Sequence, residues 1–300
     1  MIEVVRVGVG TTVQDLGRPG LAHLGVGRSG AADRPALRLA NRLVGNPEGA
    51  AALEVTLGGL VLRFRRSARV ACAGAPCPVR LGGRAAGWGT PLSVLAGEVL
   101  ELGLPPAGLR SYVAVRGGVD VRPVLGSRAT DTLAGLGPSP PAAGDLLPVG
   151  AVPTDGAEAG AGNLVGEVLD AAPTLPYPGL ATVRVLPGPR DDWFVPAALA
   201  ALTSQPYLVT AACDRVGMRL AGPGLERREV RELTSEGTVA GALQVPPDGR
   251  PILFLADHPV TGGYPVIAVV VHDDLPVAAQ LRPGDRLGFR RVAPTPARPA

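Results

Sequence analysis

Residues 235–271 have the sequence SEGTVAGALQVPPDGRPILFLADHPVTGGYPVIAVVV. Its apolar and partly β-branched runs are typical of buried strands. The Pro-Pro-Asp-Gly segment at 246–249 predicts a hairpin turn, because Gly249 tolerates a positive φ and Asp248 can bond to its own turn backbone. The Thr-Gly-Gly-Tyr-Pro segment at 261–265 is a different kind of turn: two glycines allow close approach of another group, and the proline then stiffens the chain. We therefore expect short buried strands whose turns present polar groups.

The composition extends this prediction to the whole chain of 300 residues, a length that favours two lobes. Hydrophobic residues make up 46% and aromatic residues only 3%, so the core must consist mainly of Val, Leu and Ala. The 42 glycines and 32 prolines are scattered between short apolar runs, which indicates many turns rather than many helices. The predicted fold class is mainly β, with a few short helices.

All 29 basic residues are arginine, since the sequence contains no lysine. This excludes a Schiff-base lysine, a lysine general base and the phosphate-binding lysine of a P-loop. The net charge of +3 is mild and dispersed. The cluster of Arg63, Arg65 and Arg66 lacks interleaved aromatic residues, so a solvated strand end is favoured over a nucleic-acid site.

The three cysteines form no CxxC motif, which predicts neither a zinc site nor a disulfide framework, and we expect no metal. The N-terminus has no basic-then-apolar signal pattern, and no apolar run approaches transmembrane length. We expect a cytoplasmic protein with no membrane partner and no nucleic-acid partner.

Alternating valines predict a strand over residues 2–9, and a mostly apolar run predicts another over residues 51–61. The clearest helix is predicted over residues 33–45, with Asp33 as its N-cap and Pro35 in its first turn.

In the second half, residues 181–186 predict a strand, and Asp191 or Asp192 is expected to cap a helix that runs through Leu202. The pattern of Gly, acidic residue, any residue, Leu occurs at Gly97, Gly144 and Gly284, where each copy predicts a turn that leads into a strand.

Residues 138–162 are rich in Pro, Ala and Gly and are predicted to be a linker or surface excursion. We expect an N-terminal subdomain over residues 1–170, a C-terminal subdomain over residues 171–290 and a disordered tail over residues 291–300.

Several long motifs follow one another along the chain: TTVQDLGRPG and HLGVGRSGAAD within residues 11–33, ANRLVGN at 40–46, RSYVAVRGGVD at 110–120, VLGSRATD at 124–131, DRVGMRL at 214–220, SEGTVAGALQVPPDG at 235–249 and TGGYPVIA at 261–268. In this order they resemble the biotin-dependent carboxyltransferase family, also called allophanate hydrolase subunit 2. The resemblance covers nearly the whole chain.

The resemblance implies cyclophilin-like β-barrel subdomains. It also implies partners: in the 5-oxoprolinase context, a KipI-like protein and a LamB/YcsF-like protein, which together with this chain use ATP to open 5-oxo-L-proline to L-glutamate. ATP is used by the complex, and its site is not placed on this chain. With no lysine, this chain cannot carry biotin, so any biotin must arrive on another polypeptide.

The predicted site combines the Gly-rich loop over residues 10–30 with three later turns, because a loop this long is usually functional. Predicted catalytic residues are Asp15, His23, Glu236 and Gln244, and predicted substrate-binding residues are Gln14, Arg28, Ser29, Asp214, Arg215, Thr261, Gly262, Gly263 and Tyr264.

Each predicted role follows from the chemistry of an amide or lactam substrate. Arg28 or Arg215 would clamp a carboxylate or phosphate bidentately. Gln244, with the amides of residues 262–263, would hold a carbonyl or an oxyanion. Asp15 or Glu236 would act as a base through water. The structural alternative for the charged residues is an Arg–carboxylate pair that pins a Gly-rich loop.

Three functions fit the resemblance. The first is one component of a multi-protein 5-oxoprolinase, inactive or weakly active alone. The second is the carboxyltransferase component of a biotin-dependent urea or amide carboxylase. The third is non-enzymatic: a KipA-like regulator that antagonises a histidine-kinase inhibitor.

Overall fold

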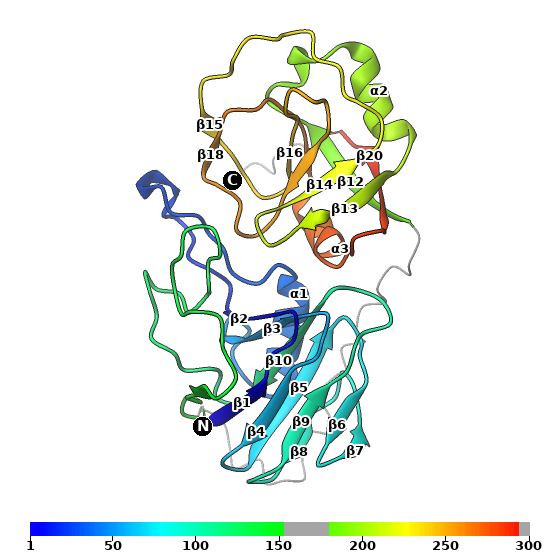
Figure 1. The fold of residues 1–300 in the computed structure, drawn as a ribbon. Coiled ribbons are helices and arrows are strands. Elements are labelled where there is room, and N and C mark those ends of the chain that lie inside the picture. The colour runs from blue at the N-terminus through cyan, green and yellow to red at the C-terminus, as the bar shows by residue number, and fades with distance from the viewer. Residues whose placement is uncertain (153–179, 294–300) are drawn as a thin grey trace.

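The computed structural model describes residues 1–152 and 180–293, which form two lobes stacked one above the other (Figure 1). Both lobes consist mainly of short strands, and one contains a closed barrel, so the prediction of a mainly β fold with barrel subdomains is confirmed. The predicted subdomain boundary near residue 170 and the part of the predicted tail beyond residue 293 lie outside the described residues. No helix within the described ranges is long and apolar enough to cross a membrane.

The N-terminal lobe consists of two sheets whose inner faces share one core. The first sheet has the order β11 (Leu146–Leu147), β1 (Ile2–Arg6), β4 (Val61–Phe64), β9 (Val99–Leu102), β6 (Val79–Leu81) and β7 (Arg84–Ala86). The second has the order β2 (Gly10–Gln14), β3 (Ala52–Thr56), β10 (Arg110–Val115), β5 (Ala68–Gly74) and β8 (Leu92–Val94). Val4 and Phe64 from the first sheet pack with Val55 and Val113 from the second.

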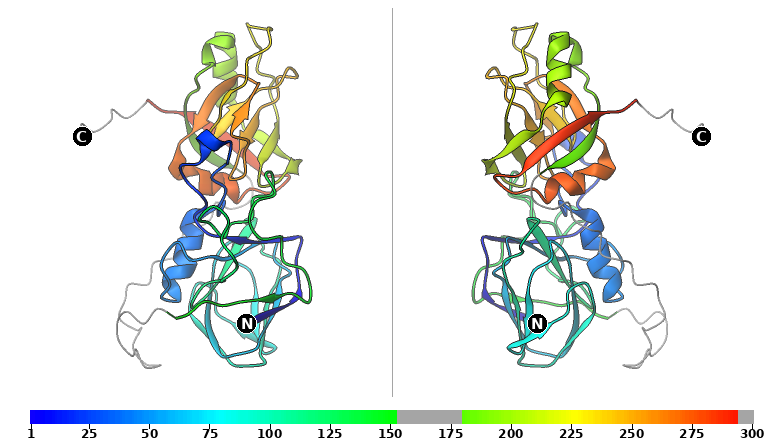
Figure 2. Two further views of the ribbon diagram at one scale, coloured as in Figure 1. Left: turned by 90° about the vertical axis from the view of Figure 1, so that its left-hand side faces the viewer. Right: turned by 90° about the vertical axis from the view of Figure 1, so that its right-hand side faces the viewer.

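Helix α1 (Arg34–Leu43) covers the outer face of the second sheet (Figure 2). Leu37 and Ala40 are fully buried and belong to a core cluster that includes Ala73 and Tyr112. The Asp33 side chain accepts a hydrogen bond from the Ala36 amide at 3.0 Å, as expected for an N-cap. The predicted helix and its cap are confirmed, with the helix ending at Leu43.

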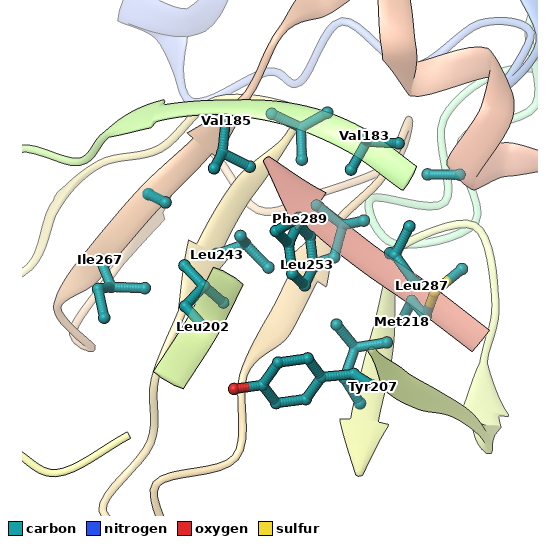
Figure 3. Packing of buried hydrophobic residues seen from close by; sticks show 14 of the residues in the cluster. Val183, Val185, Leu202, Tyr207, Met218, Leu243, Leu253, Ile267, Leu287 and Phe289 are labelled. Atoms are coloured by element: carbon teal, nitrogen blue, oxygen red, sulfur yellow. The ribbon is translucent and has the colours of Figure 1, made fainter. Parts of the chain in front are cut away.

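The C-terminal lobe is a closed barrel with the strand order β12 (Ala181–Pro187), β19 (Val266–Val270), β16 (Ala242–Gln244), β17 (Ile252–Phe254), β14 (Gly217–Ala221), β13 (Tyr207–Cys213) and β20 (Arg286–Arg291). β12 and β20 run parallel and lie side by side (Figure 2), whereas the other pairs in the barrel are antiparallel. Figure 3 shows its core, where Tyr207 and Phe289 meet edge to face with ring centroids 5.8 Å apart.

The remaining elements are short. They are the 3₁₀ turns η1 (Ala22–Leu24), η2 (Asp191–Trp193) and η3 (His272–Asp274), the helices α2 (Pro196–Ser204) and α3 (Leu275–Ala279), and the two-stranded ribbon of β15 (Glu236–Gly237) and β18 (Thr261–Gly262).

The predicted hairpin turn at 246–249 is confirmed: it joins β16 to β17, with Gly249 at a φ of 74° and its amide donating to the Pro246 carbonyl at 3.0 Å. The three Gly-acid repeats are also confirmed as turns that lead into strands, here β9, β11 and β20. In each the glycine has a positive φ, and the acidic side chain accepts a hydrogen bond from the amide three residues earlier.

Three predictions need correction. Residues 10–14 of the loop predicted over residues 10–30 form strand β2. The strand predicted over residues 51–61 is two strands, β3 and β4, because Leu57 and the two glycines after it adopt positive φ and break the ladder. The acidic pair at 191–192 lies in η2 rather than capping a helix; α2 begins at Pro196, after Val195 as its N-cap, because Phe194 is extended. The described part of the segment predicted as a linker or surface excursion, residues 138–152, is mostly exposed and runs over the N-terminal lobe, where β11 pairs with β1, as the second alternative expects.

Candidate functional site

A buried ionic network joins the two lobes. The guanidinium of Arg215 donates to both carboxylate oxygens of Asp257, at 2.9 and 3.0 Å, to the Gly30 carbonyl at 2.6 Å, and to the carboxylate of Glu54 on β3. The hydroxyl of Tyr112 donates to Glu54 at 2.7 Å. Arg215 therefore bonds to groups from both lobes. Its pair with Asp257 and its bond to the Gly30 carbonyl hold the Gly-rich loop in place, as the structural alternative for this residue predicted.

The electrostatics of this network keep its members ionised. Burial is the largest single influence and would raise the pKa of Asp257 and of Glu54. The charge of Arg215 and the hydrogen bonds that each carboxylate accepts together outweigh burial and hold both pKa values below their ordinary range. Burial alone would lower the pKa of Arg215, but the two carboxylates raise it instead. The guanidinium of Arg110 lies 3.5 Å from Glu54 and supplies a second positive charge. Two buried cations thus neutralise two buried carboxylates.

Gln280, directly after α3, forms a second buried link between the lobes. Its side-chain carbonyl accepts from the amides of Leu109 and Arg110, both at 2.9 Å. Its side-chain amide donates to Asp33 at 2.8 Å and to the Arg110 carbonyl at 2.9 Å. This one side chain therefore connects the cap of α1, the start of β10 and the C-terminal lobe.

Three residues of the predicted loop are buried and hold it in place. Asp15 accepts hydrogen bonds from the Gly17 amide, the Ser127 hydroxyl and the Arg128 amide at 2.6 to 2.7 Å. Gln14 donates to the Thr130 carbonyl at 2.8 Å, and its side-chain oxygen has no partner among the described residues. Ser29 donates to Asp257 at 2.6 Å, which ties the loop to the ionic network.

Two other predicted residues of the loop are exposed. His23 lies in η1, at the tip that rises beside the C-terminal lobe near β15 and β18 (Figures 1 and 2). Arg28 lies at the boundary between the lobes, where its Nε atom is 3.4 Å from the Leu16 carbonyl. In the C-terminal lobe, Asp214 is also exposed, and its carboxylate accepts from the amides of Val216 and Gly217.

The other predicted residues gather at the β15–β18 ribbon. Glu236 is half-buried, pairs with Gly262 across the ribbon and forms an ion pair with Arg190. The buried side chain of Gln244 donates to the Tyr264 carbonyl at 3.0 Å. A Cβ atom at Gly262 would lie 2.5 Å from the Gln244 amide nitrogen, so the ribbon packs on Gln244 only because residue 262 has no side chain. Thr261, Gly263 and Tyr264 are exposed.

A pocket of about 320 Å³ lies between the lobes. Three arginines line it on the side of the N-terminal lobe: Arg28 from the loop, and Arg34 and Arg38 from α1. The C-terminal lobe provides the facing wall, which includes Leu255, His272, Asp273, Leu275 and Pro276. Burial, followed by the charges of Arg28 and Arg38, lowers the pKa of Arg34 to about 10. The described ranges contain no group of three or more His, Cys, Asp and Glu side chains arranged to hold a metal.

The sequence prediction missed the partners that complete these clusters: Glu54, Asp257, Gln280 and the two α1 arginines that line the pocket, Arg34 and Arg38. Glu54 had a visible signal, because it is the only charged residue in an otherwise apolar run at 51–61. The contacts of Gln280 had none, since its four partners lie 170 or more residues earlier in the chain.

Comparison with known proteins gives consistent results across the chain. Residues 24–291 match the family model for the carboxyltransferase domain, subdomains A and B. An Escherichia coli protein, named as the 5-oxoprolinase subunit designated C, is 40% identical over 292 residues, covering 96% of this chain and 90% of that protein. The Haemophilus influenzae protein of the same name is 32% identical, with 98% and 92% covered.

Solved structures are similar as well. The crystal structure of the Kluyveromyces lactis urea amidolyase matches with a TM-score of 0.89 at 30% identity, over 97% of this chain and 19% of that one. The crystal structure of TTHA0988 matches with a TM-score of 0.82 at 38% identity, over 96% of this chain and 56% of that one. The chain belongs to the family of carboxyltransferase domains with subdomains A and B, as its motifs predicted.

Proposed function

We propose that this chain is the third component, designated C, of an ATP-dependent 5-oxoprolinase, which hydrolyses 5-oxo-L-proline to L-glutamate together with the KipI-like and LamB/YcsF-like proteins. The observation that carries this proposal is the 40% identity to the Escherichia coli protein of that designation, which extends over 96% of this chain and 90% of that protein. Such a match leaves little of either protein without a counterpart in the other. The Haemophilus influenzae relative, with the same name and nearly the same coverage, supports the same assignment.

The chemistry of the proposed reaction fits a site that several polypeptides build together. A lactam carbonyl is a poor electrophile, so the complex uses ATP to phosphorylate the carbonyl oxygen. Addition of water and cleavage of the ring C–N bond then give an acyl phosphate, and a second water releases phosphate and glutamate. Charge develops on oxygen in these steps, and preorganised donors such as the Gln244 amide would stabilise it.

The role proposed for each residue depends on the hydrogen bonds and ion pairs that its side chain already makes. Glu236 is half-buried and held by one arginine, Arg190, so it retains access to water as a base. Asp15 already accepts three hydrogen bonds, so its role as a base requires that one donor be released. His23 stands on an exposed tip and acts in the reaction only if a partner covers that tip. In this proposal, a second protein would complete the site.

The chain spans about half the length of the TTHA0988 chain, of which it covers 55% in one crystal form and 56% in another.

Co-expression with candidate KipI-like and LamB/YcsF-like partners, followed by an assay for glutamate release from 5-oxo-L-proline with ATP, tests the proposal. We expect release that requires ATP and all three proteins. A stable three-protein complex that releases no glutamate would overturn the proposal, and omission of each protein in turn provides the control.

A second candidate function rests on the K. lactis urea amidolyase, whose TM-score of 0.89 exceeds the 0.81 to 0.82 of TTHA0988. This favours a carboxyltransferase component that would receive the carboxyl group from biotin carried on another protein. Biotin-dependent carboxylation of urea by this chain with a biotin carboxylase and a carrier, in the absence of 5-oxo-L-proline turnover, would establish it.

A further inference from the structure

Two arginines of the pocket between the lobes have no acidic partner in the part of the chain that the structure describes. Within residues 1–152 and 180–293, no carboxylate lies within ion-pair distance of the guanidinium of Arg28 or Arg34. Arg28 has a hydrogen bond of 3.4 Å to the Leu16 carbonyl, and Arg34 has one of 3.5 Å to the Ser29 carbonyl. Arg38 differs, because Glu48 lies 3.5 Å from it. Arg28 and Arg34 therefore bring uncompensated positive charge to the pocket.

The positive charges of these arginines repel one another. The low pKa of Arg34 has burial as its first cause and repulsion from Arg28 and Arg38 as its second, so each arginine disfavours the charge of its neighbours. An anion between them would remove that repulsion and replace the lost hydration of Arg34. Guanidinium groups bind oxyanions in bidentate geometry, which suits two unpaired arginines on one wall.

The side chains, rather than the backbone of α1, would hold the anion. The Asp33 carboxylate already occupies the N-terminus of the helix by accepting from the Ala36 amide, and Pro35 has no N–H to offer. A ligand at this position must be recognised by the arginines.

The facing wall indicates what the rest of the ligand is like. Leu255, Leu275 and Pro276 present apolar surface, and Asp273 is the acidic residue on that wall. A ligand with an anionic head, a small apolar body and an N–H donor at its far end would satisfy both walls. The volume of about 320 Å³ lies at the small end of the range for ligand sites, about 300 to 1,000 Å³.

We propose that this pocket binds a small organic acid, with its carboxylate on Arg28 and Arg34 and its body against Leu255, Leu275 and Pro276. The inference rests on the proposed function only in the choice of 5-oxo-L-proline as the acid to test. The lactam N–H of that compound would face Asp273.

Calorimetric titration of the purified full chain at constant ionic strength tests the inference. The probes are 5-oxo-L-proline, its uncharged analogue 5-oxo-L-prolinamide, and inorganic phosphate. We expect saturable binding of the acid, with the amide analogue binding more weakly by at least roughly tenfold, because it lacks the charge that the arginines recognise.

The matched variants are Arg28→Gln/Arg34→Gln and, as the control, Arg66→Gln/Arg84→Gln, which removes two exposed arginines from the same lobe. We expect the pocket variant to lose roughly tenfold or more in affinity for the acid and the control to keep it. Equal affinity in the two variants, equal affinity for acid and amide, or no saturable binding of any probe would overturn the inference. Binding of phosphate in place of the acid would overturn the assignment to an organic acid.

Thermal unfolding provides a second readout, and the exposed Arg28→Gln change gives a milder variant if the double substitution prevents folding. Bound acid should raise the unfolding temperature of the wild-type chain but not of the pocket variant. Turnover by the three-protein complex without acid binding at these arginines would reject the pocket assignment alone. Binding to the pocket in a complex that does not turn over would reject the proposed function alone.

Discussion

Glu54 on β3 pairs with Arg215 of the C-terminal lobe, and both side chains are buried. Each charge also has a partner in its own lobe, Arg110 for Glu54 and Asp257 for Arg215, so the Glu54–Arg215 pair links two charge clusters across the boundary between the lobes. A buried charge that loses its partner strongly destabilises the folded state, whereas the intact pair holds the two lobes in one relative position. The relative position of the two lobes therefore contributes to the stability of each.

Glu54→Gln tests this relationship. The substitution keeps the shape of the side chain but leaves two buried arginines facing one carboxylate, so we expect the free energy of unfolding to fall by about 3 to 5 kcal/mol. Denaturant titration measures the change. Glu48→Gln is the control, because Glu48 is half-exposed and pairs with Arg42 and Arg38 on the surface, where we expect a loss below about 1 kcal/mol. Similar losses in the two variants would show that the Glu54–Arg215 pair stabilises the folded chain no more than a surface ion pair does.

The same pair predicts a pH dependence. The pKa of Glu54 lies below its ordinary value of 4.5 in the folded chain, so the folded state binds fewer protons than the unfolded state as the pH falls. The contribution of Glu54 is fully present above pH 4.5 and is lost as the pH falls through the folded pKa. We expect the difference in unfolding free energy between the wild type and Glu54→Gln to be constant between about pH 6 and 8 and to narrow below about pH 4.5. A difference that widens on acidification would contradict the assignment.

The sequence predicts elements well where the information is local. The cap at Asp33 and the turn at Gly249 depend on residues within one or two turns of the chain, and both are confirmed. The strand predicted over 51–61 was wrong because the apolar character of residues 57–60 hides the break between β3 and β4, and a leucine gives no sign that Leu57 will adopt a positive φ.

The candidate site was only partly predictable, for a different physical reason. The motifs identified residues such as Ser29 and Arg215 individually, but their contact through Asp257 depends on the packing of two lobes. The unpaired charge of Arg34 was equally hidden, because a sequence shows which arginines exist and not which carboxylates fail to reach them. Local sequence patterns therefore predict turns and caps. Which charges are paired at the boundary between the lobes can be determined only from the structure.

Gln280→Leu tests the second link between the lobes. The change keeps a similar volume but removes two hydrogen bonds to buried amides, one to Asp33 and one to the Arg110 carbonyl. Burial already raises the pKa of Asp33, and the hydrogen bond from Gln280 opposes that rise. We expect a loss of about 3 kcal/mol or more in unfolding free energy, since each unsatisfied buried group costs about 1 to 3 kcal/mol. Denaturant titration gives the value, and a loss below about 1 kcal/mol would mean that water replaces the side chain.

Gly262→Ala tests whether the β15–β18 ribbon must pack directly on Gln244. The new Cβ would lie 2.5 Å from the Gln244 amide nitrogen, so either the ribbon or the Gln244 side chain has to move, and the hydrogen bond to the Tyr264 carbonyl is disturbed. We expect a loss of about 1 to 3 kcal/mol in stability, as for overpacking in a core. If Gln244 acts on the substrate, glutamate release by the three-protein complex should fall by roughly tenfold or more.

Gly263→Ala is the matched control for this prediction, because it is the adjacent glycine and also lacks a positive φ. Its nearest neighbour would be the Leu233 carbonyl at 3.6 Å, an ordinary contact, and the substitution keeps the backbone amide that is predicted to bind substrate. We therefore expect stability and glutamate release close to those of the wild type. The comparison distinguishes a requirement for the correct position of Gln244 from a requirement for a flexible ribbon. Equal loss of glutamate release in the two variants would favour the flexible ribbon. Loss in Gly262→Ala alone would favour a role of Gln244 in the reaction.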